Sequence, residues 1–177
     1  GLYRAQGMGD AMTFEKELIS RGHVEAAPRL GSSDVGSGMS NGQRILGSVE
    51  PWHGNEVVVY TESDGVWNRR VIYEGVTSGH EVVVVDLNGD DRADIVANDN
   101  SRVTSNRPNA TPGVHVFFSP EDPATGEWSY SRIESEAAMN GCVAGDMNQD
   151  GWTDLVCTGG GGVIRWYENL GQQDSPR

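Results

Sequence analysis

Asp86-Leu87-Asn88-Gly89-Asp90-Asp91-Arg92-Ala93-Asp94 is the stretch that decides how this chain is interpreted, and it recurs 60 residues later as Asp146-Met147-Asn148-Gln149-Asp150-Gly151-Trp152-Thr153-Asp154. In both copies, side chains that carry oxygen stand at loop positions 1, 3, 5 and 9. A short turn with this spacing can wrap one hard cation such as Ca²⁺, and position 7 can add its backbone carbonyl. The sequence therefore predicts two Ca²⁺ sites, whose ligands are Asp86, Asn88, Asp90, Arg92 and Asp94 in the first copy and Asp146, Asn148, Asp150, Trp152 and Asp154 in the second.

An EF-hand is the main alternative for such a loop, but it needs a glutamate at position 12 and a helix on each side. Position 12 is Ala97 in the first copy and Cys157 in the second. The flanking segments are short, apolar and rich in β-branched residues, as β-strands are. Each copy is therefore predicted to be a β-hairpin closed by a cation. Acidic turns without a metal are less favoured, because their clustered carboxylates would repel one another.

The composition favours an all-β fold and excludes several classes of partner. The 177 residues include 24 glycines, 36% are hydrophobic, and no long run free of Gly and Pro has helical periodicity. The formal net charge of −13 argues against nucleic acid as a partner, because its binding needs Lys and Arg to neutralise phosphates. No apolar stretch has the length of a membrane span. No signal peptide is recognisable, and a first residue other than Met suggests a processed chain.

The two cysteines, Cys142 and Cys157, fall on the strands expected on either side of the second loop. A disulfide across these strands is sterically conceivable. Two buried free thiols are nevertheless the favoured prediction, because neighbouring paired strands rarely offer the required Cβ geometry. The compartment is predicted from the cation instead. Oxygen-only sites fill without help at the millimolar Ca²⁺ concentrations outside cells, so a secreted, extracellular or periplasmic protein is expected.

Internal repeats extend beyond the loops. An aromatic residue followed five positions later by isoleucine occurs three times, in the segments 14–19, 67–72 and 128–133. Strand-like segments at 55–60 and 113–118 precede the second and third of these, and 162–167 resembles them. The repeating unit is therefore predicted to have four strands: one enters the metal loop, one leaves it, one follows a glycine-rich turn and one carries the aromatic-to-isoleucine pattern.

Units of about 60 residues with four antiparallel strands are typical of β-propeller blades. The predicted boundaries are 1–19 for the end of one blade, 20–75 for a blade without a metal loop, 76–137 for a blade with a Ca²⁺ loop, 138–170 for a blade with a Ca²⁺ loop but no last strand, and 171–177 for a tail. About three blades cannot close a ring of the usual four to eight. We therefore expect a partial propeller, completed by further blades of the same parent protein or by other chains. An open array of three sheets is the alternative.

The two loops resemble the FG-GAP/VCBS repeats of integrin-like propellers, from Asp86 through Val96 and from Asp146 through Val156. Residues 166–169, Trp-Tyr-Glu-Asn, resemble an ending common in bacterial members. The resemblance implies a seven-bladed parent propeller with Ca²⁺ loops. Two departures from the family pattern stand out: the 20–75 unit lacks the loop residues, and Asp91 occupies the usual glycine position, where it is expected to strain one turn.

A narrower resemblance lies in residues 50–60, which look like a segment of propellers related to fungal aldos-2-ulose dehydratase, a group of sugar enzymes that bind metal and dehydrate or isomerise their substrate. The resemblance implies a carbohydrate lyase whose central channel is lined by His53, His80 and Glu50. Imidazole and carboxylate groups there could ligate a transition metal or abstract a proton. Local pairing of polar loop residues is the simpler explanation, for these residues and for His23 with Glu25. The preferred expectation is a Ca²⁺-stabilised module that binds protein or carbohydrate and needs no catalytic group.

Overall fold

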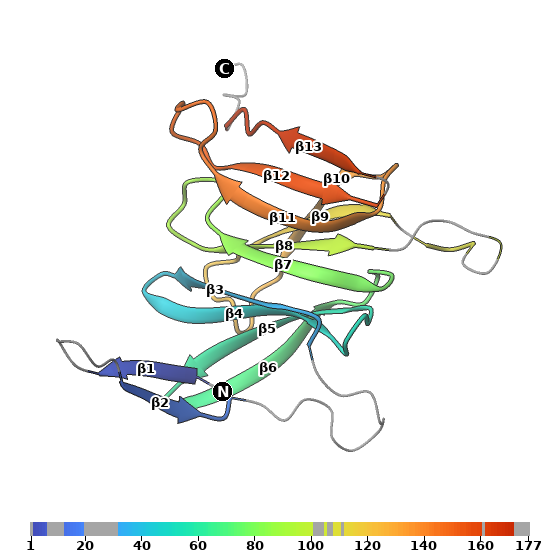
Figure 1. The fold of residues 1–177 in the computed structure, drawn as a ribbon. Coiled ribbons are helices and arrows are strands. Elements are labelled where there is room, and N and C mark those ends of the chain that lie inside the picture. The colour runs from blue at the N-terminus through green and yellow to red at the C-terminus, as the bar shows by residue number, and fades with distance from the viewer. Residues whose placement is uncertain are drawn as a thin grey trace.

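The computed structural model of the chain describes residues 2–6, 13–19, 32–100, 105, 108–110, 112–160 and 162–171. Within these ranges the protein is all-β, as predicted, with thirteen strands and no helix (Figure 1). The strands form four separate sheets, and within each sheet strands that follow one another in the sequence pair antiparallel.

The first four-stranded sheet runs in sequence order through β3 (Val35–Ser40), β4 (Gln43–Glu50), β5 (Glu56–Ser63) and β6 (Val66–Tyr73). Asn41 and Gly42 make the turn between β3 and β4, with φ angles of 48° and 76°. Two successive positive φ angles are typical of the tight hairpin turn that matches the twist of paired strands. An Asn-Gly pair between two strands is typical of this turn, so its position can be predicted from the sequence.

The second sheet repeats this order with β7 (Gly79–Val85), β8 (Asp94–Asp99), β9 (Gly113–Phe118) and β10 (Ser129–Glu134). The third sheet contains β11 (Met139–Gly145), β12 (Asp154–Gly159) and β13 (Val163–Tyr167). No fourth strand pairs with β13 among the described residues. Both predicted metal loops thus connect the first two strands of a sheet. The lack of a last strand after 162–167 stays a prediction.

A separate hairpin lies at the N-terminus. Strand β1 (Leu2–Gln6) pairs antiparallel with β2 (Thr13–Glu17), in the register Leu2↔Glu17. Whether these two strands are the end of a blade, as predicted for residues 1–19, stays a prediction. Residues 7–10, where the sequence Gly-Met-Gly-Asp predicts the turn between the two strands, lie outside the described residues.

The three larger sheets are stacked, with their first strands side by side. Strand β7 contacts β3 and β4 of the first sheet and β11 of the third (Figure 1). Glycines make the first contact close: a Cβ added at Gly36 or Gly47 would come within 2.7 or 2.8 Å of a Val84 methyl group. The described sheets form an open stack and do not close into a ring.

Each gap between sheets holds its own hydrophobic core. Ile45, Val57, Ile95, Phe117 and Trp128 belong to the buried cluster between the first and second sheets. A second cluster lies between the second and third sheets and includes Val96, Val116, Met139 and Leu155. Strand β8 contributes side chains to both cores. Successive side chains of a strand point to opposite faces of the sheet, so Ile95 belongs to the first cluster and Val96 to the second. This two-sided burial explains why its residues are apolar without interruption from Ile95 to Ala97.

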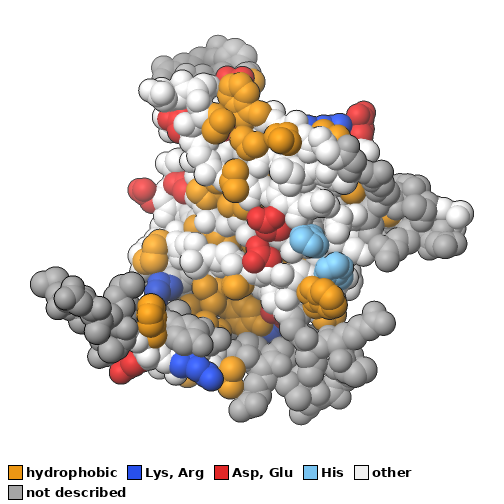
Figure 2. All heavy atoms as spheres, in the orientation of Figure 1, with side chains coloured by type: hydrophobic (Ala, Val, Ile, Leu, Met, Phe, Trp, Pro, Cys, Tyr) orange, Lys and Arg blue, Asp and Glu red, His pale blue; other side chains and the backbone are white. Residues whose placement is uncertain are grey.

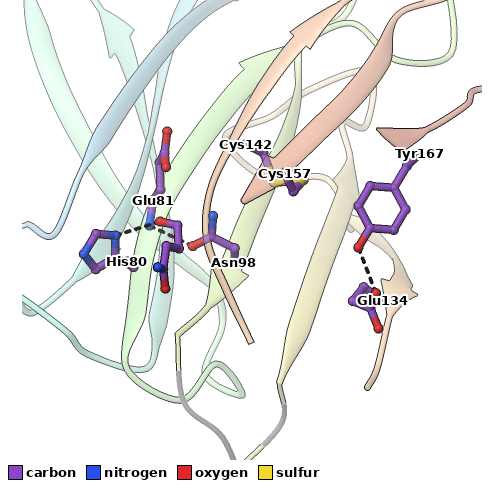
Figure 3. The surroundings of a disulfide bond; sticks show 8 residues. His80, Glu81, Asn98, Glu134, Cys142, Cys157 and Tyr167 are labelled. Carbon is purple, nitrogen blue, oxygen red and sulfur yellow. Dashed lines mark hydrogen bonds between the residues drawn. A yellow bond between two sulfur atoms is a disulfide. The ribbon is translucent and has the colours of Figure 1, made fainter. Parts of the chain in front are cut away.

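The two cysteines correct one sequence prediction, because Cys142 and Cys157 form a disulfide between β11 and β12 (Figure 3). They are direct partners in the ladder, and their Cα atoms are 4.0 Å apart. Side chains approach most closely at such narrow pairs of an antiparallel ladder, which is why the bond can form here. The second sheet has Val82 opposite Ala97 at the equivalent position. The prediction of two free thiols was therefore wrong.

Candidate metal-binding loops and a histidine–carboxylate patch

The first loop is organised around the carboxylate of Asp86. Its Oδ1 accepts hydrogen bonds from the backbone N–H groups of Gly89 at 2.8 Å and Asp90 at 3.3 Å, and its Oδ2 accepts one from Asp91 at 2.9 Å. The chain therefore turns around the first predicted ligand. Asp91 adopts a φ of 63° in this turn, in the left-handed region that favours glycine. The strain expected at Asp91 is thus present.

Two further steps continue the first loop. The backbone N–H of Asp90 donates to Asn88 Oδ1 at 3.2 Å, and that of Arg92 donates to Asp90 Oδ1 at 3.0 Å. The side chains at positions 3 and 5 thereby each accept a bond from the residue two places on. Such bonds hold asparagine and aspartate side chains over their own turn.

The second loop repeats four of these five bonds with a different sequence. Asp146 accepts from the N–H groups of Asp150 at 3.1 Å and Gly151 at 3.0 Å. Asn148 Oδ1 accepts from Asp150 at 3.2 Å, and Asp150 Oδ1 accepts from Trp152 at 2.8 Å. Two loops that share only the oxygen-bearing positions therefore fold alike. The hydrogen-bond geometry that the two loops share follows from the oxygen-bearing positions and not from the residues between them.

The aspartate at position 9 joins each loop to the end of the third strand of its sheet. Asp94 is fully buried, and its carboxylate accepts from Leu87 N at 3.0 Å and from Ser119 N at 2.9 Å. Asp154 accepts from Met147 N at 3.0 Å and from Asn169 N at 2.8 Å. Both oxygens of each carboxylate thus brace the hairpin. A role for either residue as a cation ligand remains a prediction.

The pKa values of the two position-9 aspartates shift in opposite directions. Burial raises the pKa of Asp94 to about 6, outweighing its bonds from Ser119 and Leu87. The bond from the Asn169 N–H lowers the pKa of Asp154. The first loop therefore holds a carboxylate that gives up its proton less readily than its counterpart in the second.

Charges around the loops also differ. Arg92 forms an ion pair with Asp90, and its Nε donates to Ser119 O at 3.1 Å. Trp152 stands at the equivalent position of the second loop and brings no charge. There Asn148 Nδ2 donates to Glu168 Oε1 at 3.0 Å, so the second loop gains a carboxylate. The first loop is partly neutralised by its own arginine, whereas the second is more acidic.

The donor chemistry of both loops fits Ca²⁺. Each offers carboxylate, amide and backbone carbonyl oxygens, which Ca²⁺ accepts together, and neither offers the nitrogen or sulfur ligands that zinc prefers. Within the described ranges no group of three or more His, Cys, Asp or Glu side chains is placed so that it could hold a metal ion. A Ca²⁺ site in these loops would therefore depend on the amide and carbonyl oxygens as well as on the carboxylates.

The structure brings together two of the three candidate channel residues. The rings of His53 and His80 lie 5.3 Å apart between centroids, and the Trp52 ring lies 4.6 Å from that of His53. His80 Nδ1 lies 2.8 Å from the backbone oxygen of Asn140, which fixes the ring between the second and third sheets. Figure 2 shows two histidine side chains next to acidic side chains on this face. We call His53, His80, Glu81 and Asp34 the histidine–carboxylate patch.

Glu81 and Asp34 supply the acid groups of the patch. Burial raises the pKa of Glu81, and the nearby charge of Asp34 raises it further. The Glu81 carboxylate lies against Gly141, where an added Cβ would be 1.7 Å from Oε2. Asp34 Oδ2 accepts from Val82 N at 3.2 Å. The sequence alone pairs Glu81 with His80, but nothing in it places Asp34 there, because the contact bridges two sheets.

Glu50 has a different environment. It is buried, accepts a 2.7 Å hydrogen bond from the Tyr60 hydroxyl and forms a 2.8 Å ion pair with Arg69 Nε. Both carboxylate oxygens are therefore used within the first sheet and not by a histidine. His23 and Glu25, the other pair considered from the sequence, lie outside the described residues.

Comparison with known proteins does not assign the chain to a family. No protein-family model matches the sequence, and no curated protein shows significant similarity to it. No helix in the described part of the chain is long and apolar enough to cross a membrane. Any function therefore has to be argued from the loops and the patch.

Proposed function

We propose that the chain is part of a Ca²⁺-stabilised β-propeller that binds protein or carbohydrate outside the cell or in the periplasm. The observation that carries the proposal is the shared hydrogen-bond geometry of the two loops, in which Asp, Asn and Asp at positions 1, 3 and 5 accept the same backbone bonds. Bound Ca²⁺ would offset the repulsion between these oxygens. The resemblance to FG-GAP/VCBS repeats and the four-stranded antiparallel sheets support the same proposal.

The ligand-binding part of the proposal is supported by the face that carries the histidine–carboxylate patch. Trp52 is 63% exposed and stands beside His53. An exposed aromatic ring on the same face as the carboxylates of the patch offers an apolar surface together with hydrogen-bond acceptors, the combination used by polar ligand sites. A sugar or a polar protein segment is therefore the favoured class of ligand.

A sugar dehydratase or isomerase is the second candidate, and the proximity of His53 to His80 is the observation that favours it. The two imidazoles could supply two ligands of a transition metal, and a partly buried acid such as Glu81 could exchange a proton with a substrate. Tight Zn²⁺ or Mn²⁺ binding that is lost in His53→Ala and His80→Ala would support the enzyme. Unchanged binding in these variants would count against it.

Thermal unfolding tests the Ca²⁺ proposal. Wild type and an Asp86→Asn/Asp146→Asn variant are heated in millimolar Ca²⁺ and in excess chelator. Ca²⁺ at about 100 times its Kd stabilises a single-site protein by roughly 2.7 kcal/mol, so the wild-type Tm should rise by several degrees. The variant should show little or no rise. Equal wild-type Tm values in the two buffers would overturn the proposal.

A further inference from the structure

A cavity of about 420 Å³ lies between the second and third sheets, on the side away from the first strands. Apolar side chains from both sheets dominate its lining, chiefly Val116, Phe118, Ile133, Leu155, Tyr167 and Leu170. Both predicted metal loops reach its rim, through Asn88 and Trp152. Its volume is in the ~300–1,000 Å³ range of ligand pockets.

The preceding gap, between the first and second sheets, is filled by Trp128. This side chain is only 8% exposed and belongs to the same buried cluster as Ile95 and Phe117. Its Nε1 donates to Pro123 O at 3.3 Å. Arg70 of the first sheet donates to Gly126 O at 2.7 Å and so holds the connection before Trp128 against β6. An aromatic side chain just before a fourth strand thus seals this gap.

The cavity occupies the equivalent position in the next gap. Strand register pairs Ile95 with Phe117 in the second sheet and Leu155 with Tyr167 in the third. Ser119 and Asn169 make the same backbone bond to the position-9 aspartates. The neighbours of Trp128 therefore have counterparts, Leu155 and Tyr167, that line the cavity. The described residues of the third sheet supply no counterpart of Trp128 itself.

Among the described residues β13 pairs only with β12, and its other edge lies where a fourth strand would pair. Ile164 and Trp166 are 72% and 51% exposed. Cys142 and Cys157 form a narrow pair, so the backbone groups of Cys157 point toward Arg165 on β13. The direction of the backbone hydrogen-bonding groups alternates from one residue to the next along a strand. The backbone N–H groups of Ile164 and Trp166 therefore point to the edge of β13 that faces away from β12. This edge can accept another strand without breaking existing bonds.

We propose that the cavity and the edge of β13 together bind an extended segment of a partner polypeptide, whose leading aromatic side chain enters the cavity while the following residues pair antiparallel with β13. The segment would resemble Trp128 and β10, in which an aromatic residue precedes an edge strand. In the second sheet, Trp128 fills the gap toward the first sheet and β10 forms the fourth strand. This inference deepens the proposed function by naming a partner, and it does not depend on Ca²⁺.

The test uses a fluorescent peptide with the sequence of residues 123–134, added to the full chain and followed by anisotropy in Ca²⁺ and in chelator. We expect saturable binding that weakens about tenfold or more when the peptide carries Trp128→Ala, because the aromatic anchor is lost. Ile164→Pro in the protein should weaken binding similarly, since it removes an edge N–H. Ile164→Ala keeps that N–H and is the matched control.

The outcomes separate this inference from the Ca²⁺ proposal. Absence of peptide binding in both buffers, or equal binding of the Trp128→Ala peptide, overturns the strand-binding surface. Self-association that Ile164→Pro abolishes would assign the edge to a second copy of the chain and would also overturn it. Peptide binding in a chain that fails to bind Ca²⁺ would contradict only the Ca²⁺ proposal. If Ile164→Pro unfolds the protein, the proposal is still tested by comparing how the wild-type protein binds the 123–134 peptide and its Trp128→Ala variant.

Discussion

The carboxylate of Glu134, at the end of β10, accepts a 2.8 Å hydrogen bond from the hydroxyl of Tyr167 on β13, so one buried acid joins the last described strands of two neighbouring sheets (Figure 3). Arg165 of β13 forms an ion pair with the same carboxylate. The backbone N–H groups of Ser135 and Glu136 add bonds of 2.9 and 2.7 Å. The chain segment that leaves the second sheet is therefore fixed to the third by a single side chain.

Glu134→Gln should destabilise the protein. The change weakens the bonds from Tyr167 and Arg165 and leaves a guanidinium without its counter-charge, at a cost of about 1–3 kcal/mol. Urea unfolding of both proteins at neutral pH measures the difference. Glu136→Gln is the matched control, because that side chain is exposed and only its backbone N–H takes part. Equal losses in the two variants would contradict the role of the Glu134 carboxylate.

Acid should remove the contribution of Glu134. Burial alone would raise its pKa, but the bonds from Glu136 N, Tyr167 and Arg165 outweigh burial and lower the pKa to about 2, from an ordinary 4.5. A depressed carboxyl pKa stabilises the fold above the ordinary value, and this stability is lost as the pH falls from 4.5 toward 2. The stability difference between wild type and Glu134→Gln should therefore shrink over this range. A difference that stays constant down to pH 2 would show that ionisation of Glu134 is not its source.

Removing the disulfide should lower stability without changing the fold. Cys142→Val/Cys157→Ala copies the Val82 and Ala97 pair of the second sheet, so packing is preserved while the cross-link is lost. Closing a loop of about 15 residues is worth about 3 kcal/mol in the chain-entropy estimate. Thermal unfolding measures the loss. Alkylation of the unfolded wild type without reductant should label no cysteine, and labelling of both would show that the bond is absent.

The position-9 aspartates should matter even without a cation. In chelator, Asp94→Asn should cost about 1–3 kcal/mol, because the buried N–H groups of Leu87 and Ser119 then face an amide with one acceptor oxygen. Asp91→Asn is the control, since its side chain is exposed and asparagine also tolerates a left-handed φ. If Asp94→Asn is neutral in chelator but abolishes Ca²⁺ binding, Asp94 is a ligand and not a brace.

Sequence reasoning predicted best what depends on short spacings. The turns around Asp86 and Asp146 are made by bonds between residues two to five apart, so their positions in the chain were enough. The repeats likewise predicted the order of the strands. The brace from Asp94 to Ser119 was missed, because it spans 25 residues and depends on the pairing of three strands.

Contacts between sheets were the least predictable. His53 and His80 were both candidates, but only the packing of the first sheet on the second shows that their rings meet and that Asp34 lies near Glu81. Glu50 looked equally suitable from the sequence, yet Arg69 and Tyr60 occupy it within its own sheet. The disulfide was misjudged because the sequence does not show that Cys142 and Cys157 form a narrow pair of the ladder, where opposite side chains approach most closely.

Direct measurement of Ca²⁺ binding tests the central claim, that both loops hold a cation. Isothermal titration of the demetallated full chain with Ca²⁺ should show two ions per chain, and Asp90→Asn and Asp150→Asn should each remove one. The second loop should bind more tightly, because Glu168 adds a carboxylate there while Arg92 offsets Asp90 in the first. No binding at millimolar Ca²⁺, or binding that survives both substitutions together, would contradict the account.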